Sequence, residues 1–224
     1  MSSLGVTWQV DQLSFHPVSK LGKRFVNIIA PDVDRLRFQM SENQSTNLQR
    51  ITWGLSAPQN PQLNDQNECE KFNLDLTVES DELKTLLHEL DRKCEKEAME
   101  HSVEWFGKKL DERDINLKFN PLLKRKDDGT CTVRVKVAGE TAKVPTNVWV
   151  VSDSSGTQIK YFKGTLEHLT KDALCLVMVE ASSIWFSKLF GISLNVLDIM
   201  VWPVDKKEGI FTLNLPGVKL VEAV

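Results

Sequence analysis

Apolar and polar residues alternate through the stretch WFSKLFGISLNVLDIMVW, which spans residues 185–202. The apolar positions are every second one up to Val196, and they resume one residue out of phase from Leu197 onward. Side chains of a strand point alternately to its two faces, so a slip of one residue requires a β-bulge or a bend. The pattern predicts one long curved strand, or two strands that meet at a corner near Phe190-Gly191.

Period-two alternation or a short apolar run also marks the other strands that the sequence predicts. A polar, proline-containing loop is expected from Ala57, where APQNPQLNDQNE offers no periodicity. The further expected strands are Gly5–Val10, Phe25–Ile29, Leu36–Met40, Ile51–Leu55, Lys71–Val78, Ile115–Phe119, Val144–Val151, Gln158–Phe162 and Leu174–Val179.

A helix is predicted over about residues 81–107. Ser80 is a suitable N-cap, and Asp81 and Glu82 complement the helix dipole in the first turn. Apolar residues recur at spacings of three and four, which predicts one stripe packed on a sheet. Gly107 is a suitable end. The stripe consists of Leu83, Leu87, Leu90, Cys94, Ala98, His101 and Trp105.

A β-hairpin with a charged tip is predicted after this helix. The basic run of residues 122–126 leads into Asp127-Asp128-Gly129, a turn signal, and CTVRVKV follows as a strand. The predicted class is therefore α+β, mainly β.

The 224 residues, of which 41% are hydrophobic, are expected to form one domain. Within it we expect N-terminal strands and a loop (1–79), the helix (80–110), a strand-rich core (111–202) and a C-terminal tail (203–224). The start MSSLGVTWQV lacks the pattern of a signal peptide, and no window is apolar enough for a membrane span. We expect a soluble, intracellular protein.

Charge is distributed unevenly along the chain, although the net charge is only −3. Residues 65–114 contain 16 acidic and 8 basic side chains, whereas residues 118–171 contain 10 basic and 5 acidic ones. The strand-rich part would therefore face a polyanion if the protein binds one.

Motifs of catalysis or metal binding are not found in the sequence. There is no phosphate-binding loop, no Gly-x-Ser-x-Gly, and neither the four histidines nor the four dispersed cysteines have metal-ligand spacing. The carboxylates at 111, 112 and 114 could hold Mg²⁺, but a solvated turn is the more common role of such a group. We therefore predict no catalytic residue, no metal and no cofactor.

Three segments in order resemble the replication-type single-stranded DNA-binding proteins of phages and large DNA viruses. They are FNPLLKRKDDGTCTVRVKV (119–137), YFKG (161–164), and residues 185–202 with their aromatic pair and Phe190-Gly191. The resemblance covers about residues 115–202 and implies an OB-fold-like, partly open barrel. It departs from the family pattern at the end, GVKLVEAV, which lacks a strongly acidic tail.

Binding a single strand without sequence preference requires cations for the phosphates and aromatic faces for the bases. Adjacent aromatics on a strand point to opposite faces, so one ring of Tyr161-Phe162 and one of Trp185-Phe186 should face outward. We favour Tyr161 and Trp185 for stacking, while burial of all four rings stays an alternative. Trp105 and Trp149 are expected to be buried. The candidate phosphate contacts are Lys118, Lys124, Arg125, Lys126, Arg134, Lys136, Lys160, Lys163 and Lys188.

The leading hypothesis is a non-catalytic, sequence-tolerant single-stranded DNA-binding protein in replication, recombination or repair, located where DNA is replicated: the host nucleus or a cytoplasmic viral factory, if the protein is viral. RNA stays open as a ligand, since stacking does not distinguish the sugars. Replication proteins and a second copy of the chain are further candidate partners, and a membrane is not. The alternative is a viral structural or protein-interaction β protein that uses its aromatics as an oligomer interface.

Overall fold

A computed structural model describes residues 10–19, 24–30, 35–40, 48–56, 71–153 and 159–204. The strand expected at Gly5–Val10 lies outside these residues except for Val10, and so do the loop from Ala57 and most of the C-terminal tail.

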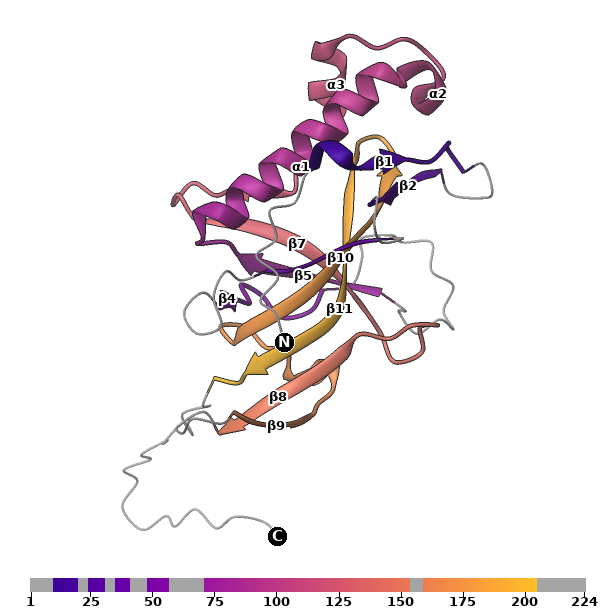
Figure 1. Cartoon of the computed structure of the whole chain (residues 1–224). Helices are drawn as coiled ribbons and strands as arrows, with labels where there is room; N and C mark the ends of the chain where they lie inside the picture. The colour runs from indigo at the N-terminus through magenta and orange to yellow at the C-terminus, as the bar shows by residue number, and fades with distance from the viewer. Residues whose placement is uncertain are drawn as a thin grey trace, which may run out of the picture.

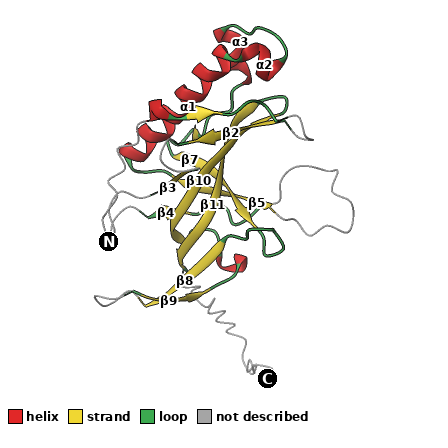
Figure 2. Cartoon of the chain, turned by 45° about the vertical axis from the view of Figure 1, so that its right-hand side comes forward, coloured by secondary structure: helices red, strands yellow, loops and turns green. Residues whose placement is uncertain are grey.

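The fold is α+β and mainly β, as the sequence predicts, and its sheet curls into an open, OB-fold-like half-barrel (Figures 1 and 2). The helices are α1 (Asp81–Glu100), α2 (Ser102–Phe106) and α3 (Glu112–Lys118), with short 3₁₀ turns η1 (Val10–Gln12) and η2 (Leu166–His168). The strands are β1 (Ser14–Phe15), β2 (Phe25–Ile29), β3 (Leu36–Gln39), β4 (Gln49–Arg50), β5 (Lys71–Thr77), β6 (Leu123–Arg125), β7 (Cys131–Ala138), β8 (Asn147–Asp153), β9 (Lys160–Lys163), β10 (Leu174–Phe186) and β11 (Phe190–Trp202).

The helical segment follows the predicted pattern except at His101, which was predicted on the packed stripe but is exposed, at a break between α1 and α2. The Ser80 hydroxyl accepts a hydrogen bond from the Leu83 amide at 3.1 Å, which satisfies one of the free donors of the first turn. Gly107 ends α2 in the left-handed conformation, at φ +76°. Within the described residues, none of the helices has the length and apolar character needed to cross a membrane.

Strands β10 and β11 form a long antiparallel hairpin that runs through the middle of the sheet (Figure 1). β10 also pairs with β2, β3 and β4, whereas β11 pairs in parallel with β7 and then with β8. The edge strand β9 pairs with β8, and β5 and β6 pair with β7. The hairpin turn lies at the helical end of the molecule, and β8 and β9 lie at the opposite end (Figures 1 and 2).

The predicted phase slip in β11 is a β-bulge at Leu197. Val179 pairs with Val196 and Met178 pairs with Asp198, so Leu197 is the extra residue. The bulge keeps one face buried along the whole strand. Its buried side chains are Ile192, Leu194 and Val196 before the bulge and Ile199 and Val201 after it.

The Phe190-Gly191 corner has a different role from the bend that the sequence suggested. The bend is at the bulge, while Gly191 permits a close approach of another backbone segment. A Cβ at Gly191 would lie 2.6 Å from the carbonyl oxygen of Asn120 and 3.3 Å from the Trp185 ring. Phe190 itself is fully buried.

An aromatic cluster packs the helices against the Phe190-Gly191 corner. Phe190 packs against Phe106 at 5.1 Å and Phe119 at 5.2 Å between ring centroids, and Trp105 lies edge-on to Phe186 at 5.7 Å. Trp105 is 1% exposed, in agreement with its predicted burial. The helical end is thus a packed part of the core.

Two strand predictions were wrong. Residues 115–118 belong to the helix α3 instead of forming a strand, because the Asp111 carboxylate caps the helix by accepting from the Asp114 amide at 2.8 Å. Phe119, the C-cap, forms only an isolated bridge with Phe190. Ile51–Leu55 contributes only an isolated bridge at Ile51, and the strand β4 ends at Arg50.

Candidate nucleic-acid interface

We define the outward face as the side of β10 and β11 that points away from the core. On β11 its side chains are Ser193 and Asn195 before the bulge and Asp198 and Met200 after it. Because the bulge corrects the phase, these residues stay on one side of the sheet. The strands alongside β11 determine what else lies on this face.

Trp149 and Tyr161 form an aromatic pair at the β8–β9 end of the outward face. Their ring centroids are 5.8 Å apart in an edge-to-face arrangement. The Trp149 indole donates to Asp198 at 3.4 Å, and Trp149 lies opposite Met200 on β11 and opposite Lys163 on β9. Tyr161 is 56% exposed. The predicted burial of Trp149 was wrong, since β8 covers the core with its other face and leaves Trp149 half-buried.

Trp185 lies at the other end of the outward face, near the β10–β11 turn. Its ring packs on Gly191, its cross-strand partner, and it is half-buried. Phe186, the next residue, points into the aromatic cluster around Phe190. The structure thus separates the two rings to opposite sides, as strand geometry requires.

Tyr161 and Phe162 are also on opposite sides of their strand, yet both are exposed. Phe162 is 49% exposed and has an edge-to-face contact with His168, with centroids 6.1 Å apart. β9 is an edge strand of which all four residues are exposed, so neither face of it is fully covered.

Lys136 lies between the two aromatic ends of the outward face. It is on β7, beside Asn195 of β11, and its ammonium donates to the Ser193 hydroxyl at 2.9 Å. Arg134, two residues earlier, is bound by Asp75 of β5 through two hydrogen bonds of 2.7 and 2.8 Å. This bidentate ion pair raises the pKa of the Arg134 guanidinium and neutralises its charge. The Lys136 ammonium thus contacts a neutral hydroxyl of the outward face, whereas a carboxylate holds the Arg134 guanidinium.

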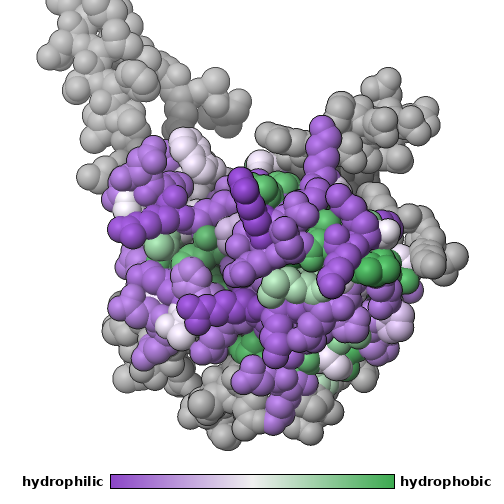
Figure 3. Space-filling model, turned by 90° about the horizontal axis from the view of Figure 1, so that it is seen from above, coloured by the Kyte–Doolittle hydropathy of each residue, from purple (hydrophilic) through white to green (hydrophobic). Residues whose placement is uncertain are grey.

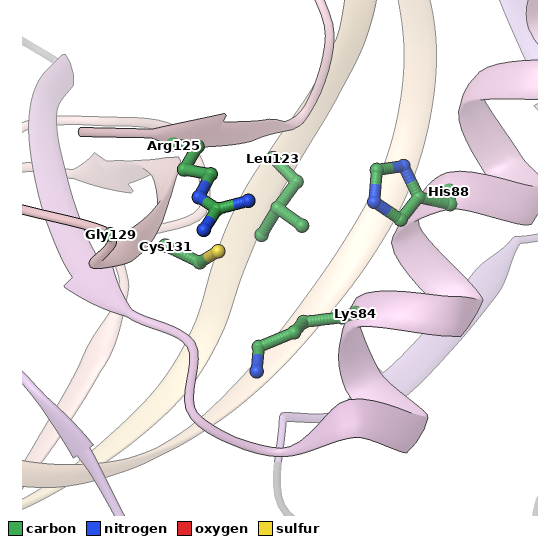
Figure 4. A pocket seen from close by; sticks show the side chains of 6 residues that line it. All are labelled: Lys84, His88, Leu123, Arg125, Gly129 and Cys131. Carbon is green, nitrogen blue, oxygen red and sulfur yellow. The ribbon is translucent and has the colours of Figure 1, made fainter. Parts of the chain in front are cut away.

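The basic run Lys124, Arg125 and Lys126 lies on and after β6, as the predicted hairpin requires, and all three side chains are exposed. Figure 4 shows Arg125 opposite Lys84 and His88 of α1 across a cavity of about 530 Å³. The half-buried Cys131 is in its lining. Arg125 is on the α1 side of the sheet, whereas Lys124 pairs with Thr132 and so shares the side of β7 that carries Arg134 and Lys136.

Lys118 and Lys188 line a second cavity, of about 200 Å³, which we call the tip pocket. It lies at the β10–β11 turn, beside the helices. Viewed from the helical end in Figure 3, the surface is mostly hydrophilic with small hydrophobic areas. The tip pocket is lined by Arg24, Trp105, Phe106, Lys108, Lys118, Phe186, Ser187, Lys188, Leu189 and Phe190.

The structure therefore divides the candidate residues among three places. The outward face contains Lys136, Tyr161, Lys163 and Trp185, with Lys160 at the start of the same edge strand and with Arg134 and Lys124 on the β7–β6 side. Sequence reasoning missed Trp149 because it sits within an apolar run. Pairing the two predicted strands around SDSSG as a hairpin would have brought it close to Tyr161.

One group in the described part of the chain combines three metal-ligand side chains: Glu97, Glu100 and His101. It lies at the end of α1, where His101 is within 3.6 Å of Glu97 and of Glu104. The suspected carboxylates at 111–114 serve another purpose, since Asp111 caps α3. These carboxylates make contacts within the helical segment, at the end of the molecule that carries the helices.

The chain belongs to a protein family described as "Family of unknown function (DUF5871)", whose model matches residues 61–211. The match includes α1 to α3 and β5 to β11, and with them every named residue of the outward face. Among curated proteins no match is found.

Solved structures of single-stranded DNA-binding proteins from two bacteriophages are similar to this chain. The protein from bacteriophage Enc34 in complex with single-stranded DNA is 13% identical, with a TM-score of 0.42, and the match covers 88% of this chain and 99% of that one. A C-terminally truncated form is 12% identical, with a TM-score of 0.42 and coverage of 86% and 97%. The protein gp2.5 of bacteriophage T7 is 12% identical, with a TM-score of 0.44, and the match covers 78% of this chain and 96% of that one.

These proteins are of the class that the sequence resembles. At such TM-scores the likeness carries no argument about what this chain binds. The case for a ligand rests on the residues of the outward face.

Proposed function

We propose that this chain is a non-catalytic protein that binds single-stranded DNA along its outward face. The observation that supports this most is the placement of Trp185 and of the Trp149–Tyr161 pair on the same face of the sheet, with Lys136 between them. Stacking on aromatic rings accepts any base, so the binding is sequence-tolerant.

The dimensions of the face suit an extended strand. Gly191, beside Trp185, and Met200, beside Trp149, are nine residues apart on β11, which corresponds to about 30 Å at roughly 3.3 Å per residue. A surface of this length fits the roughly 4–16 nucleotides that one OB-fold covers. Lys136 and Lys163 would neutralise phosphates, and Asp198 orients the Trp149 indole.

The role that follows from such binding is protection or organisation of displaced strands in replication, recombination or repair. Replication proteins are then the expected partners, and sites of DNA replication the expected location. RNA would use the same rings, and a competition experiment with an RNA of equal sequence separates the two ligands.

Fluorescence anisotropy tests the proposal. A labelled oligo-dT of about 30 nucleotides is titrated with the protein at several salt concentrations, with duplex DNA of equal length as competitor. We expect submicromolar binding that weakens linearly in log salt and weak competition by the duplex. Absence of binding at low salt, or a duplex that competes equally well, would reject the proposal.

An oligomer interface is the second candidate function, and Phe162 is the observation that favours it. This ring is exposed on the side of β9 away from Tyr161, where a strand on the outward face would not reach it. Light scattering after size exclusion distinguishes the candidates. A stable oligomer that Phe162→Ala dissociates, together with no oligo-dT binding, would favour the interface.

A further inference from the structure

The tip pocket brings four cationic residues together from four separate segments. Arg24 precedes β2, Lys108 follows α2, Lys118 is the last residue of α3, and Lys188 is in the β10–β11 turn. Because they come from different parts of the chain, they are not a solvated face of one element. The fold itself brings these charges together.

Carboxylates that would balance these charges are missing from the pocket lining, as far as the described residues show. Over the same residues, none of the ion pairs involves Arg24, Lys108, Lys118 or Lys188. Like charges held in one pocket repel each other, and a bound anion removes that repulsion. The lining therefore favours a negatively charged ligand.

Arg24 is already oriented for such a ligand. Its guanidinium donates to the carbonyl oxygen of Trp105 and lies 5.9 Å from the centre of the Phe186 ring. The aromatic wall behind it, which includes the fully buried Phe190, is part of the core. A guanidinium fixed against an apolar wall loses little freedom when it binds an anion, and its field is screened less than in open solvent.

The size of the pocket restricts the ligand. A volume of about 200 Å³ is below the roughly 300–1,000 Å³ of sites that take a whole drug-sized molecule. A phosphate group fits this description, since it is small and offers several oxygens to lysine and arginine donors.

The position of the pocket relates it to the outward face. Trp185 is on that face, and Phe186, the next residue, is in the pocket lining, as are the turn residues that follow. A strand stacked on Trp185 that continues past the turn would reach the pocket at the end of its path. We propose that the tip pocket binds the terminal phosphate of the single strand, an inference that rests on the proposed function.

A terminal phosphate is a better ligand for four cations than a phosphate inside the strand. A monoester carries a charge of about −1.5 to −2 near neutral pH, as known from phosphorylated side chains. A phosphate within the strand is a diester with a single negative charge. The pocket would thereby fix which end of the strand lies at the turn.

The test compares three oligo-dT molecules of equal length, with a 5′-phosphate, a 3′-phosphate or two hydroxyl ends. Each competes against an internally labelled oligonucleotide. We expect one of the two phosphorylated molecules to bind about tenfold more tightly than the unphosphorylated one. The double variant Lys118→Gln/Lys188→Gln should lose this difference, and the matched control Lys96→Gln/Lys143→Gln, at two exposed lysines outside the pocket, should keep it.

Calorimetry with inorganic phosphate as the probe keeps the two proposals distinguishable. If all three oligonucleotides bind equally well, the terminal-phosphate inference is overturned and the proposed function stands. If none binds, while inorganic phosphate binds the wild type and not the double variant, the proposed function is wrong and the strand is not the ligand of the pocket.

Discussion

The two ends of the outward face offer the same kinds of side chain in different settings. At the turn end, Trp185 packs on Gly191, and the cluster around Phe190 with the helices covers the opposite side of the hairpin there. At the other end, Tyr161 is on an edge strand, and its ring contact in the structure is with Trp149. Residue type alone does not distinguish these ends. What differs is how many elements hold each ring.

This difference predicts different behaviour on binding. Side chains that are fixed before binding lose less conformational entropy when a ligand orders them. Trp185 is half-buried against Gly191, whereas Tyr161 is 56% exposed on an edge strand. The turn end should therefore define the position of the strand, and the β8–β9 end should tolerate variation.

The largest expected effect concerns Asp91, which ties α1 to the chain before β6. Its two carboxylate oxygens accept from the Leu122 amide at 3.0 and 3.2 Å, and the residue is 4% exposed. Burial raises its pKa to about 7. The folded state thus binds this proton more tightly than the unfolded state. The contribution of Asp91 to stability should be fully present below about pH 4 and should be lost, by up to about 4 kcal/mol, as the pH rises to and through 7.

Chemical denaturation between pH 4 and 8 measures this. Asp91→Asn keeps an acceptor for the Leu122 amide and cannot ionise, so it should flatten the profile and be the more stable form at pH 8. Glu89→Gln, an exposed change on the same helix, should leave the slope as it is. An unchanged slope in Asp91→Asn would show that Asp91 is not the titrating group.

The second-largest expected effect is the loss of DNA affinity when an aromatic ring is removed at either end of the outward face. Tyr161→Ala and Trp185→Ala should each reduce the affinity for oligo-dT by about 1–3 kcal/mol, since each ring stacks on a base. The two losses should add, because the sites are far apart. Phe162→Ala, next to Tyr161 but on the opposite side of β9, is the matched control and should have little effect. If only one end responds in the anisotropy assay, a single strand does not span both.

The smallest expected effect is on the salt dependence of DNA binding, in which Lys136 and Arg134, the two cations in the middle of the face, should differ. Lys136→Gln should reduce the slope of log affinity against log salt by about 0.7, the value for one phosphate contact on a single strand. Arg134→Gln should leave that slope nearly unchanged, because Asp75 already neutralises this guanidinium. Equal slopes for the two variants would mean that the Arg134–Asp75 pair opens when DNA binds.

Sequence reasoning was most successful where a periodic pattern was long. The stripe of α1, the alternation in β5 and the phase slip in β11 each extend over seven or more residues, and the structure contains all three. Five residues at 115–119 also alternate, but so short a window fits a helix equally well, and the cap at Asp111 decided the outcome.

The candidate site could be predicted less fully, because it depends on contacts between distant segments. The Arg134–Asp75 pair requires β5 and β7 to lie side by side, although 59 residues separate the two side chains. Likewise, the tip pocket combines Arg24 with lysines from three later segments. No local pattern contains this information, so the sequence identified the cations without showing which of them are neutralised.

Because of the bulge at Leu197, the side chains on the outward face depend on the number of residues in β11. One residue more or fewer between Val196 and Ile199 would exchange the two sides of every position that follows. Met200 and Trp202 would then turn inward, and Ile199 and Val201 would be exposed to water. Natural variation in this protein should therefore substitute the outward residues at the end of β11 more readily than it changes the length of the strand.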